Sequence, residues 1–193
     1  RMNEIVLRKF DPHTMERDGC ICLFVGKRRT GKSTLIKDIF YFMRNWVRDG
    51  LLFAGTADSQ RSFSGIIPDL FIFDGYNRDA LKSFVRRNKR INRERDQRGL
   101  PKHLSFVLLD DCGFDSDFTK DPVLKEIFQN GRHYGIFFMF TLQYSMSIKP
   151  EARSQIDYVF ICREVIRKNR ERLWQEYAGI VPNFKDFNQI MDQ

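Results

Sequence analysis

Short, nearly continuous apolar runs recur along the chain, and none of them alternates cleanly between apolar and polar residues. Strands that are buried on both faces have this pattern, which is typical of a mostly parallel sheet covered by helices. The runs that we expect to form strands are Cys20–Val25, Leu51–Ala54, Leu70–Phe73, Leu104–Leu109, Ile136–Phe140 and Tyr158–Cys162.

The segments between these runs carry apolar residues at helical spacing, as the crossovers between parallel strands require. In one of them, Asp121 and Pro122 form a helix start signal and Gly131 a stop signal. The other expected helices are Lys32–Val47, Asn77–Arg98, Ile166–Tyr177 and a short terminal helix over Asn183–Gln193, whereas Thr56–Pro68 is expected to be the longest loop.

Strands and helices alternate from end to end, which predicts a three-layer α/β architecture. We see no internal repeat, low-complexity tract or linker, and therefore expect one domain over residues 1–193. The chain reaches Gln193 without an ending signal, which leaves room for a C-terminal extension.

Composition narrows the class of protein further. A hydrophobic fraction of 42% with 30% charged residues excludes a long disordered chain and a membrane-embedded one. No apolar run approaches the roughly 18 residues of a spanning helix, so we expect no stable transmembrane insertion. The cysteines have no zinc spacing, and three of the four lie in apolar runs, which predicts buried, reduced thiols in an intracellular protein.

The charge is unbalanced, with 33 Lys and Arg residues against 25 Asp and Glu and a net charge of +8. Such a balance favours an anionic partner, nucleic acid or nucleotide, although solubility alone is the other explanation. The segment Arg86–Arg98 is either a solvated helix end or a contact for DNA phosphates. Its candidate DNA-binding residues are Arg86, Arg87, Lys89, Arg90 and Arg93, and a weaker second patch comprises Arg163, Arg167, Lys168, Arg170 and Arg172.

Directly after the first apolar run, residues 26–33 read G-x-x-x-x-G-K-S, the phosphate-binding P-loop, and a helix pattern follows. Its glycines let backbone N–H groups and the helix N-terminus point at one phosphate chain. Lys32 can reach the β- and γ-phosphates, and the Ser33 hydroxyl can bind Mg²⁺. We thus predict ATP and Mg²⁺ as ligands, held by Gly26, Lys27, Arg28, Arg29, Thr30, Gly31, Lys32, Ser33 and Thr34.

A second chemical feature is the pair Asp110 and Asp111, which ends the run Leu104–Leu109. A carboxylate at the end of a neighbouring strand completes a P-loop metal site, so Asp110 is the candidate Mg²⁺ ligand. Asp111 is the candidate for orienting or deprotonating the attacking water. The pair could also merely cap a strand.

Two other enzyme classes remain open for this pattern. Asp110 to Gly113 also matches the D-x-x-G motif of GTPases, but no guanine-reading N-K-x-D motif follows. A nucleotide kinase is the second alternative, with Arg86–Arg98 in the place of a phosphate lid.

Three segments in this order resemble the FtsK–HerA superfamily of DNA-pumping ATPases: Asn130–Gln143, the Leu-Leu-Asp-Asp run ending at Asp111, and Arg153–Phe160. Within that superfamily the chain is most similar to the poxvirus-type virion DNA-packaging ATPases of nucleocytoplasmic large DNA viruses. The likeness covers Leu23 to Cys162. Related ATPases usually have a Glu where this chain has Asp111. The shorter side chain of Asp111 is a departure from the family pattern.

The resemblance implies a sheet with strand order 5-1-4-3-2, in which Cys20–Val25 is strand 1. It implies that Gln143 lies near the γ-phosphate and senses it, although Gln143 could also be a strand-end cap. Arg132 and Arg153 become candidates for touching a neighbouring subunit's ATP in a ring, and a structural salt bridge is the alternative for each. His133 is more typical of a packing or hydrogen-bonding residue than of a catalytic base.

The predicted function is an ATP-hydrolysing double-stranded DNA translocase that packages a viral genome into the capsid. Its expected partners are DNA, further copies of itself in a ring, and capsid or inner-membrane proteins. Its expected location is the virion and the host cytoplasm, within the viral factory. The alternatives are a nucleotide kinase, another non-motor P-loop NTPase, and a P-loop binding or assembly module with little turnover.

Overall fold

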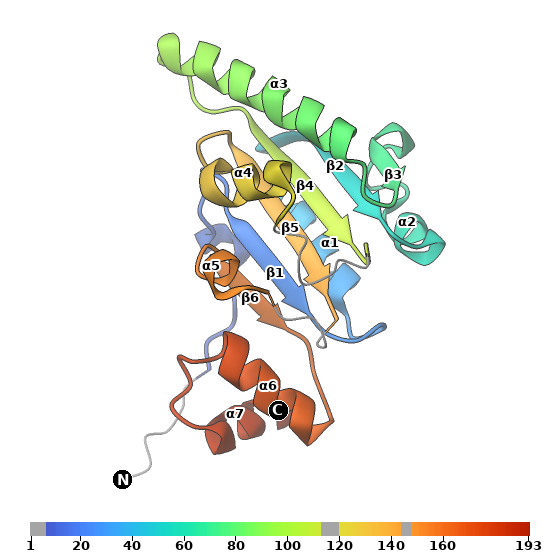
Figure 1. Ribbon diagram of the computed structural model, residues 1–193, viewed down its shortest axis with the longest axis vertical. Coiled ribbons are helices and arrows are strands. Elements are labelled where there is room, and N and C mark those ends of the chain that lie inside the picture. Colours follow the sequence, from blue (N-terminus) through green and yellow to red (C-terminus); the bar gives the residue numbers. More distant parts are fainter. Residues whose placement is uncertain (1–6, 113–119, 144–147) are drawn as a thin grey trace.

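One sheet of parallel strands, with helices on both of its faces, forms the centre of the computed structural model (Figure 1). The structure describes residues 7–112, 120–143 and 148–193. The strands are β1 (Ile21–Val25), β2 (Val47–Ala54), β3 (Ile72–Asp74), β4 (Leu104–Asp110), β5 (Ile136–Leu142) and β6 (Tyr158–Ile161).

The spatial order of the strands is β3-β2-β4-β5-β1-β6, and every pairing is parallel. Read from β6 to β2, this is the predicted order 5-1-4-3-2, with β5 inserted between β1 and β4. The short strand β3 adds a sixth position beyond β2. The predicted α/β class and strand order are therefore confirmed, with one additional edge strand.

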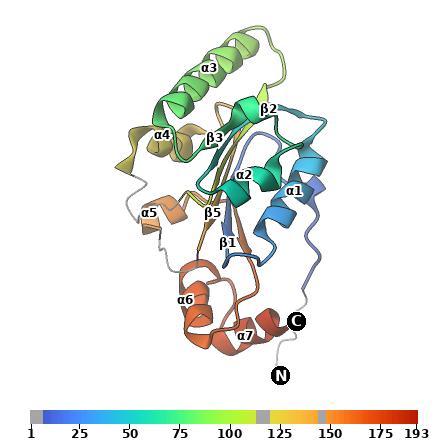
Figure 2. The same cartoon turned by 90° about the vertical axis from the view of Figure 1, so that its right-hand side faces the viewer.

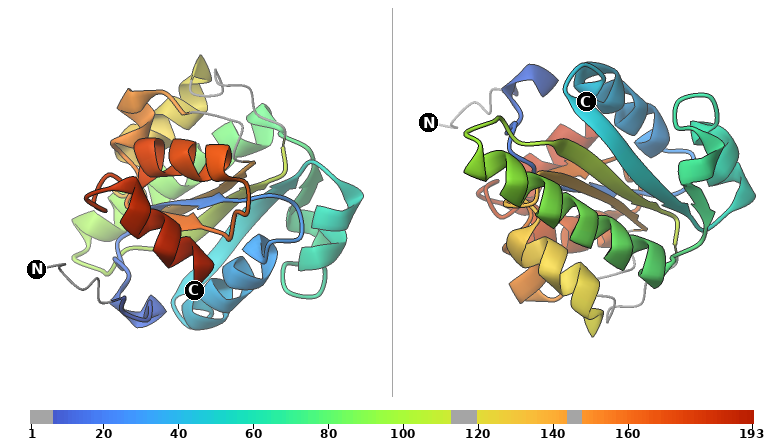
Figure 3. Two further views of the ribbon diagram at one scale, coloured as in Figure 1. Left: turned by 90° about the horizontal axis from the view of Figure 1, so that it is seen from below. Right: turned by 90° about the horizontal axis from the view of Figure 1, so that it is seen from above.

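Helices cover the two faces of the sheet unequally (Figure 2). On one face lie α1 and α2, on the other α3 and α4, while α6 and α7 pack beyond the β6 edge (Figure 3). The helices are α1 (Lys32–Met43), α2 (Ala57–Phe63), α3 (Arg78–Gln97), α4 (Pro122–Asn130), α5 (Pro150–Arg153), α6 (Arg167–Tyr177) and α7 (Phe184–Asp192), with short 3₁₀ turns at Pro12–Thr14 and Asp69–Phe71.

The central strands supply a separate core on each side of the sheet. In β1, Leu23 faces the core under α3 and α4, while Phe24 faces the core under α1, because successive side chains point to opposite faces. All residues of β1 and β5 are buried, as their continuous apolar runs predict. The same expectation for β3 and β6 is wrong: these edge strands are only half-buried or exposed, since each has a single neighbour.

Three predicted boundaries differ in the structure. The first helix ends at Met43, and Val47 already belongs to β2. The expected loop Thr56–Pro68 contains α2, which begins because the Thr56 hydroxyl accepts a hydrogen bond from Ser59 N at 3.2 Å. Of the expected strand Leu70–Phe73, the first two residues lie in a 3₁₀ turn.

Helix α3 has an unusual buried face. Its first half buries Leu81, Phe84 and Val85, but the second half buries two asparagines, Asn88 and Asn92. Asn92 Nδ2 donates to the carbonyls of His103 (2.9 Å) and Tyr134 (2.7 Å), and Asn92 Oδ1 accepts from His103 N (2.7 Å). These hydrogen bonds thus fasten the highly charged half of α3 to the sheet. The end of α3 extends past the edge of the sheet (Figure 1).

Two smaller expectations are corrected. All four cysteines are free thiols, but only Cys20 and Cys22 are buried, whereas Cys112 and Cys162 lie at strand ends and are half-buried. Arg170 is not part of a surface patch: it is 6% exposed and bonds to Asn188 and Asp192 of α7. Among the described residues, no helix is long and apolar enough to cross a membrane.

Candidate functional site

A cavity of about 1380 Å³ opens outside the carboxyl ends of β1, β4 and β5. Open parallel α/β sheets bind their ligands at this edge, where strand order reverses. The predicted site residues that line the cavity are Arg28, Arg29, Gly31, Lys32, Ser33, Thr34, Asp110, Asp111 and Gln143. Sequence segments more than 100 residues apart therefore meet in one place, as the P-loop interpretation requires.

The loop after β1 has the backbone of a phosphate cradle. Gly26 N donates to Leu142 O at 3.1 Å, and a Cβ on Gly26 would lie 2.6 Å from Cys162 Cβ, so only glycine fits there. Gly31, with φ of 96°, turns the chain into α1 through the left-handed region. The free N–H groups of the first turn of α1 adjoin the cavity and suit an anion.

Lys32 lies at the centre of this loop. Its Nζ donates to the carbonyl oxygens of Gly26 (2.6 Å) and Lys27 (2.7 Å). Burial lowers the pKa of the ammonium, and the charges of Asp110 and Asp111 act in the opposite direction. The loop thus holds a compact positive charge beside the acidic pair.

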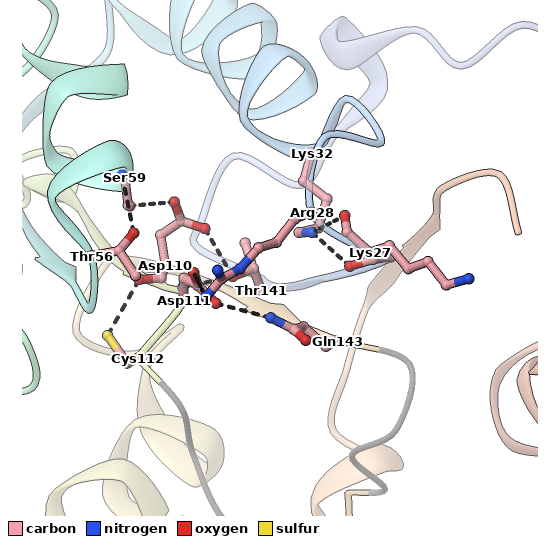
Figure 4. A network of polar contacts seen from close by, with 11 residues as sticks. Lys27, Arg28, Lys32, Thr56, Ser59, Asp110, Asp111, Cys112, Thr141 and Gln143 are labelled. Carbon is pink, nitrogen blue, oxygen red and sulfur yellow. Dashed lines mark hydrogen bonds and ion pairs between the residues drawn. The ribbon is translucent and has the colours of Figure 1, made fainter.

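The Lys27 side chain takes a different direction, away from the acidic pair (Figure 4). Its Nζ pairs with Glu164 Oε1 at 3.1 Å, in the segment between β6 and α6. Glu164 is 3% exposed and accepts from the backbone N–H groups of Val165 (2.8 Å) and Ile166 (2.9 Å). Burial acts to raise the pKa of this carboxyl, but these bonds and Lys27 hold the pKa below its usual value. The Lys27 side chain therefore anchors the loop.

Asp110 is held from both sides. This carboxylate is 4% exposed, and Ser59 Oγ donates to its Oδ2 at 2.5 Å while Thr141 Oγ1 donates to its Oδ1 at 2.8 Å. Sequence reasoning did not single out either hydroxyl. The sequence could have indicated Thr141, because it is a polar residue near the end of an apolar strand. It comes one position after Phe140, which pairs with Leu109.

Asp111 points across the cavity toward two other chain segments (Figure 4). Its N–H donates to Thr141 Oγ1 (3.0 Å), Gln143 Nε2 donates to its Oδ1 (3.3 Å), and Arg28 Nη2 lies 3.4 Å from its Oδ2. Its φ of 51° is left-handed. Gly55 lets the backbone of Asp111 pass this closely, because a Cβ on residue 55 would lie 2.0 Å from Asp111 O.

The donor set at the cavity suits Mg²⁺. Ser33 and Asp110 both line it, and they offer a hydroxyl and a carboxylate, the hard oxygen ligands that Mg²⁺ prefers. The Ser59 and Thr141 hydroxyls each occupy one lone pair of Asp110, and the remaining lone pairs stay available to a metal ion or its water. The residues present therefore fit the predicted ion.

The structure does not bring Arg132 and Arg153 to this cavity. Arg132 forms an ion pair with Asp157 before β6, where Asp157 also accepts from Ile21 N at 2.8 Å. Arg153 Nη1 donates to Glu176 O at 2.9 Å. Both arginines lie near the edge where the strands begin, opposite the P-loop, and His133 is exposed at that same edge.

The five basic residues predicted on α3 fall into two groups. Arg87 pairs with Asp49 at 2.5 Å, and Lys89 pairs with Glu126 at 3.4 Å. Arg86, Arg90 and Arg93 are exposed, and no ion pair joins them to another described residue.

Fold and cavity together define a P-loop NTPase, and comparison with known proteins gives the family. The chain belongs to the poxvirus A32 protein family, whose model matches residues 7–192. The resemblance predicted from the three sequence segments is thereby confirmed.

A viral relative is similar in sequence, and a solved structure is similar in fold. The chain is 34% identical over 180 residues to uncharacterized protein 075L of Invertebrate iridescent virus 6, covering 91% of this chain and 66% of that protein. It thus spans about two thirds of that relative's length. The genome packaging NTPase B204 of Sulfolobus turreted icosahedral virus 2, solved with AMP, has a similar fold, with a TM-score of 0.64, 16% identity, and 89% and 88% of the two chains covered.

Proposed function

We propose that this chain is the motor of viral genome packaging, which hydrolyses ATP to move double-stranded DNA into a capsid. The observation that carries the proposal is the single cavity in which Lys32 and Ser33 of the P-loop face Asp110, Asp111 and Gln143. Membership of the A32 family and a fold shared with a genome packaging NTPase support the same function.

The chemistry of the proposed reaction follows from the positions of these groups. The triphosphate lies along the N–H groups that begin α1, and Lys32 exchanges its carbonyl partners for β- and γ-phosphate oxygens. Ser33 and Asp110 would hold Mg²⁺, which would supply further positive charge for the phosphate oxygens. Asp111 accepts a hydrogen bond from the attacking water, orients it toward the γ-phosphate and takes its proton as the bond to phosphorus forms and ADP leaves.

Gln143 has a proposed role in coupling hydrolysis to movement. From the end of β5, the Gln143 amide donates to Asp111, so a shift of Asp111 on hydrolysis is passed to the end of β5. Arg28, whose side chain is 71% exposed, contacts the other oxygen of the same carboxylate from the P-loop side. Gln143 and Arg28 thus connect the water-positioning group to two separate segments.

Assembly is the second part of the proposal. P-loop motors of this kind gain rate when a neighbouring subunit supplies an arginine to the γ-phosphate. Arg132 and Arg153 remain the candidates, and each would have to exchange its partner, Asp157 or Glu176, for the neighbour's phosphate. Ring formation, capsid or inner-membrane partners, and action in the virion or the host cytoplasm are further parts of this proposal.

The nucleotide kinase alternative loses its main support in the structure. It placed Arg86–Arg98 as a lid over the phosphates, but this half of α3 runs away from the carboxyl edge of the sheet (Figure 1). None of these residues lines the cavity.

The test is phosphate release from ATP in three parallel reactions: with duplex DNA, with a nucleoside monophosphate, and with neither. We expect duplex DNA alone to raise the rate. Stimulation by the nucleoside monophosphate, with formation of a diphosphate, would establish a kinase instead. A slow rate that neither addition changes, across all protein concentrations, would indicate a binding module.

A further inference from the structure

The exposed face of α3 carries a row of basic residues that includes one residue beyond the predicted set. With five buried residues defining the inner face, Lys82, Arg86, Arg90 and Arg93 occupy the outer one, at intervals of four, four and three residues. This spacing places side chains in line along a helix. Lys82, Arg86, Arg90 and Arg93 are hereafter called the α3 stripe.

The members of the α3 stripe are exposed, and no ion pair joins any of them to another described residue. The neighbouring cations of α3 are engaged within the chain. Arg78 pairs with Asp121 (3.3 Å), Arg87 with Asp49 (2.5 Å) and Lys89 with Glu126 (3.4 Å). The helix therefore separates its cations into those that fix it to the protein and those that face outward.

Contacts on the buried side of α3 fix the position of its exposed face. Asn92 fastens the charged half of α3 through three hydrogen bonds, two donated to the carbonyls of His103 and Tyr134 and one accepted from His103 N. Burying an asparagine costs free energy unless its amide is hydrogen-bonded, so these three bonds stabilise the buried side chain and fix this part of the helix. The arrangement gives a fixed row of charges, about 16 Å long at 1.5 Å per residue.

We propose that the α3 stripe grips the phosphate backbone of duplex DNA, while Arg87 and Lys89 position α3 and make no DNA contact; the inference rests on the proposed DNA-moving function. Duplex DNA presents about one negative charge per 1.7 Å of axis, so a row of four cations over this length meets several phosphates. Contacts of Arg and Lys to phosphates position a protein without reading sequence, as a motor that must move along any sequence requires.

The test measures binding of a labelled duplex by fluorescence anisotropy over a range of salt concentrations. The variant carries K82Q, R86Q, R90Q and R93Q, which remove four charges and retain long polar side chains. The matched control, R8Q, K9Q, R17Q and R48Q, removes three Arg charges and one Lys charge that are exposed and lie outside α3, α6 and the P-loop. Binding of a fluorescent ATP analogue checks that both proteins keep an intact nucleotide site.

The wild-type protein and the control variant should bind DNA with the same salt dependence. The α3 variant should bind more weakly on every sequence tested, and its log–log salt slope should be shallower by about 0.9 for each phosphate that the protein no longer neutralises, up to about 3.6 for four phosphates. An unchanged slope in the α3 variant, or a larger change in the control, would overturn the inference while leaving DNA binding intact. Absence of DNA binding by the wild-type protein would overturn the proposed function as well.

Discussion

At the residue scale, three side chains fix the acidic pair at the end of β4. Ser59 and Thr141 each bond one oxygen of Asp110, and Thr141 also accepts from the N–H of Asp111. Gln143 then orients the second carboxylate. The two neighbouring aspartates thus have separate surroundings, which suits separate roles in holding a metal ion and positioning water.

The role of Asp111 is tested by Asp111→Asn. We expect ATP to bind with little change in affinity, because the P-loop is intact, while kcat falls by about 10²–10⁴-fold, because an amide cannot take the proton. Steady-state hydrolysis and binding of a fluorescent ATP analogue measure the two effects. Asp58→Asn is the control, since Asp58 also lines the cavity but pairs with Arg61. Full turnover in Asp111→Asn would move the water-positioning role to another residue, with Gln143 the next to test.

Ser59 is expected to act through Asp110. Ser59→Ala removes one donor to the carboxylate, so the Mg²⁺ concentration for half-maximal hydrolysis should rise roughly threefold to tenfold, as loss of about 1 kcal/mol of hydrogen bonding implies. Mn²⁺ binding with ADP, followed by electron paramagnetic resonance, gives a readout independent of turnover. Ser62→Ala, at the cavity wall, should change neither. If Ser59→Ala kept wild-type affinity for the metal ion, the hydroxyl would only support α2.

How far the sequence predicts the site depends on the distance between partners along the chain. The P-loop residues are contiguous, and the acidic pair ends an apolar run. Both features can therefore be recognised from a short stretch of sequence. Ser59 lies 51 residues from Asp110 in a segment expected to be a loop. No local pattern reveals such a contact, because it depends on where α2 lies over the sheet.

At the element scale, the segment after β6 links the P-loop to the last two helices. Lys27 meets Glu164, and Arg170 Nε donates to the Glu164 carbonyl at 2.5 Å while its guanidinium binds Asn188 and Asp192. The connection runs without a break from the loop to α7. The P-loop is thereby supported from the C-terminal helices as well as from α1.

Glu164→Gln tests this link through stability. We expect the free energy of unfolding at pH 7 to fall by about 1–3 kcal/mol, because a buried charged acceptor loses its ion pair. The pKa of Glu164 is lowered in the folded state, so its contribution is present above the unfolded value and is lost as pH falls through the folded one. The difference between variant and wild type, measured by urea unfolding, should therefore shrink as the pH falls below the ordinary pKa of a glutamate.

The control is Glu171→Gln, which breaks an exposed pair with Arg167 at 3.3 Å and should cost less than about 0.5 kcal/mol. Equal losses in both variants at pH 7, or a Glu164→Gln difference that persists in acid, would contradict the proposed link.

The sequence predicts a helix or strand correctly where its apolar residues follow one clear spacing. It fails where polar residues are buried, because they interrupt that spacing. The central strands and α1 follow from continuous or helical apolar patterns. In α3, the apolar pattern fades after Val85, with only Ile91 beyond it, and the sequence alone predicts a solvated end or a DNA contact but no buried face. The structure instead buries Asn88 and Asn92, whose partners come from the sheet and from the turn before β5.

At the scale of the whole molecule, the P-loop cavity and the proposed DNA-binding surface occupy different sides. The cavity lies at the carboxyl edge of the sheet, whereas α3, which carries the α3 stripe, lies on one face of the sheet (Figure 2). The two are connected along the chain, because Gly75 lines the cavity and α3 begins at Arg78. Net charge indicated an anionic partner, but only the fold shows which cations are paired within the chain.

Assembly should control the rate of hydrolysis. An arginine supplied by a neighbouring subunit is worth roughly 10³–10⁵-fold in related phosphoryl transfers, so the rate per subunit should climb with protein concentration. Arg153→Ala or Arg132→Ala subunits mixed with Asp111→Asn subunits should recover turnover if that arginine acts across an interface. A rate per subunit that stays constant from monomer to oligomer would exclude such an arrangement.

The central claim is that ATP hydrolysis at this cavity moves duplex DNA. The most direct measurement is displacement of a labelled third strand from a DNA triplex, because a protein moving along the duplex strips it off. We predict displacement with ATP and Mg²⁺, none with a non-hydrolysable analogue, and none by Lys32→Ala. Hydrolysis that DNA stimulates without any displacement of the third strand, in an assembled protein, would contradict the claim.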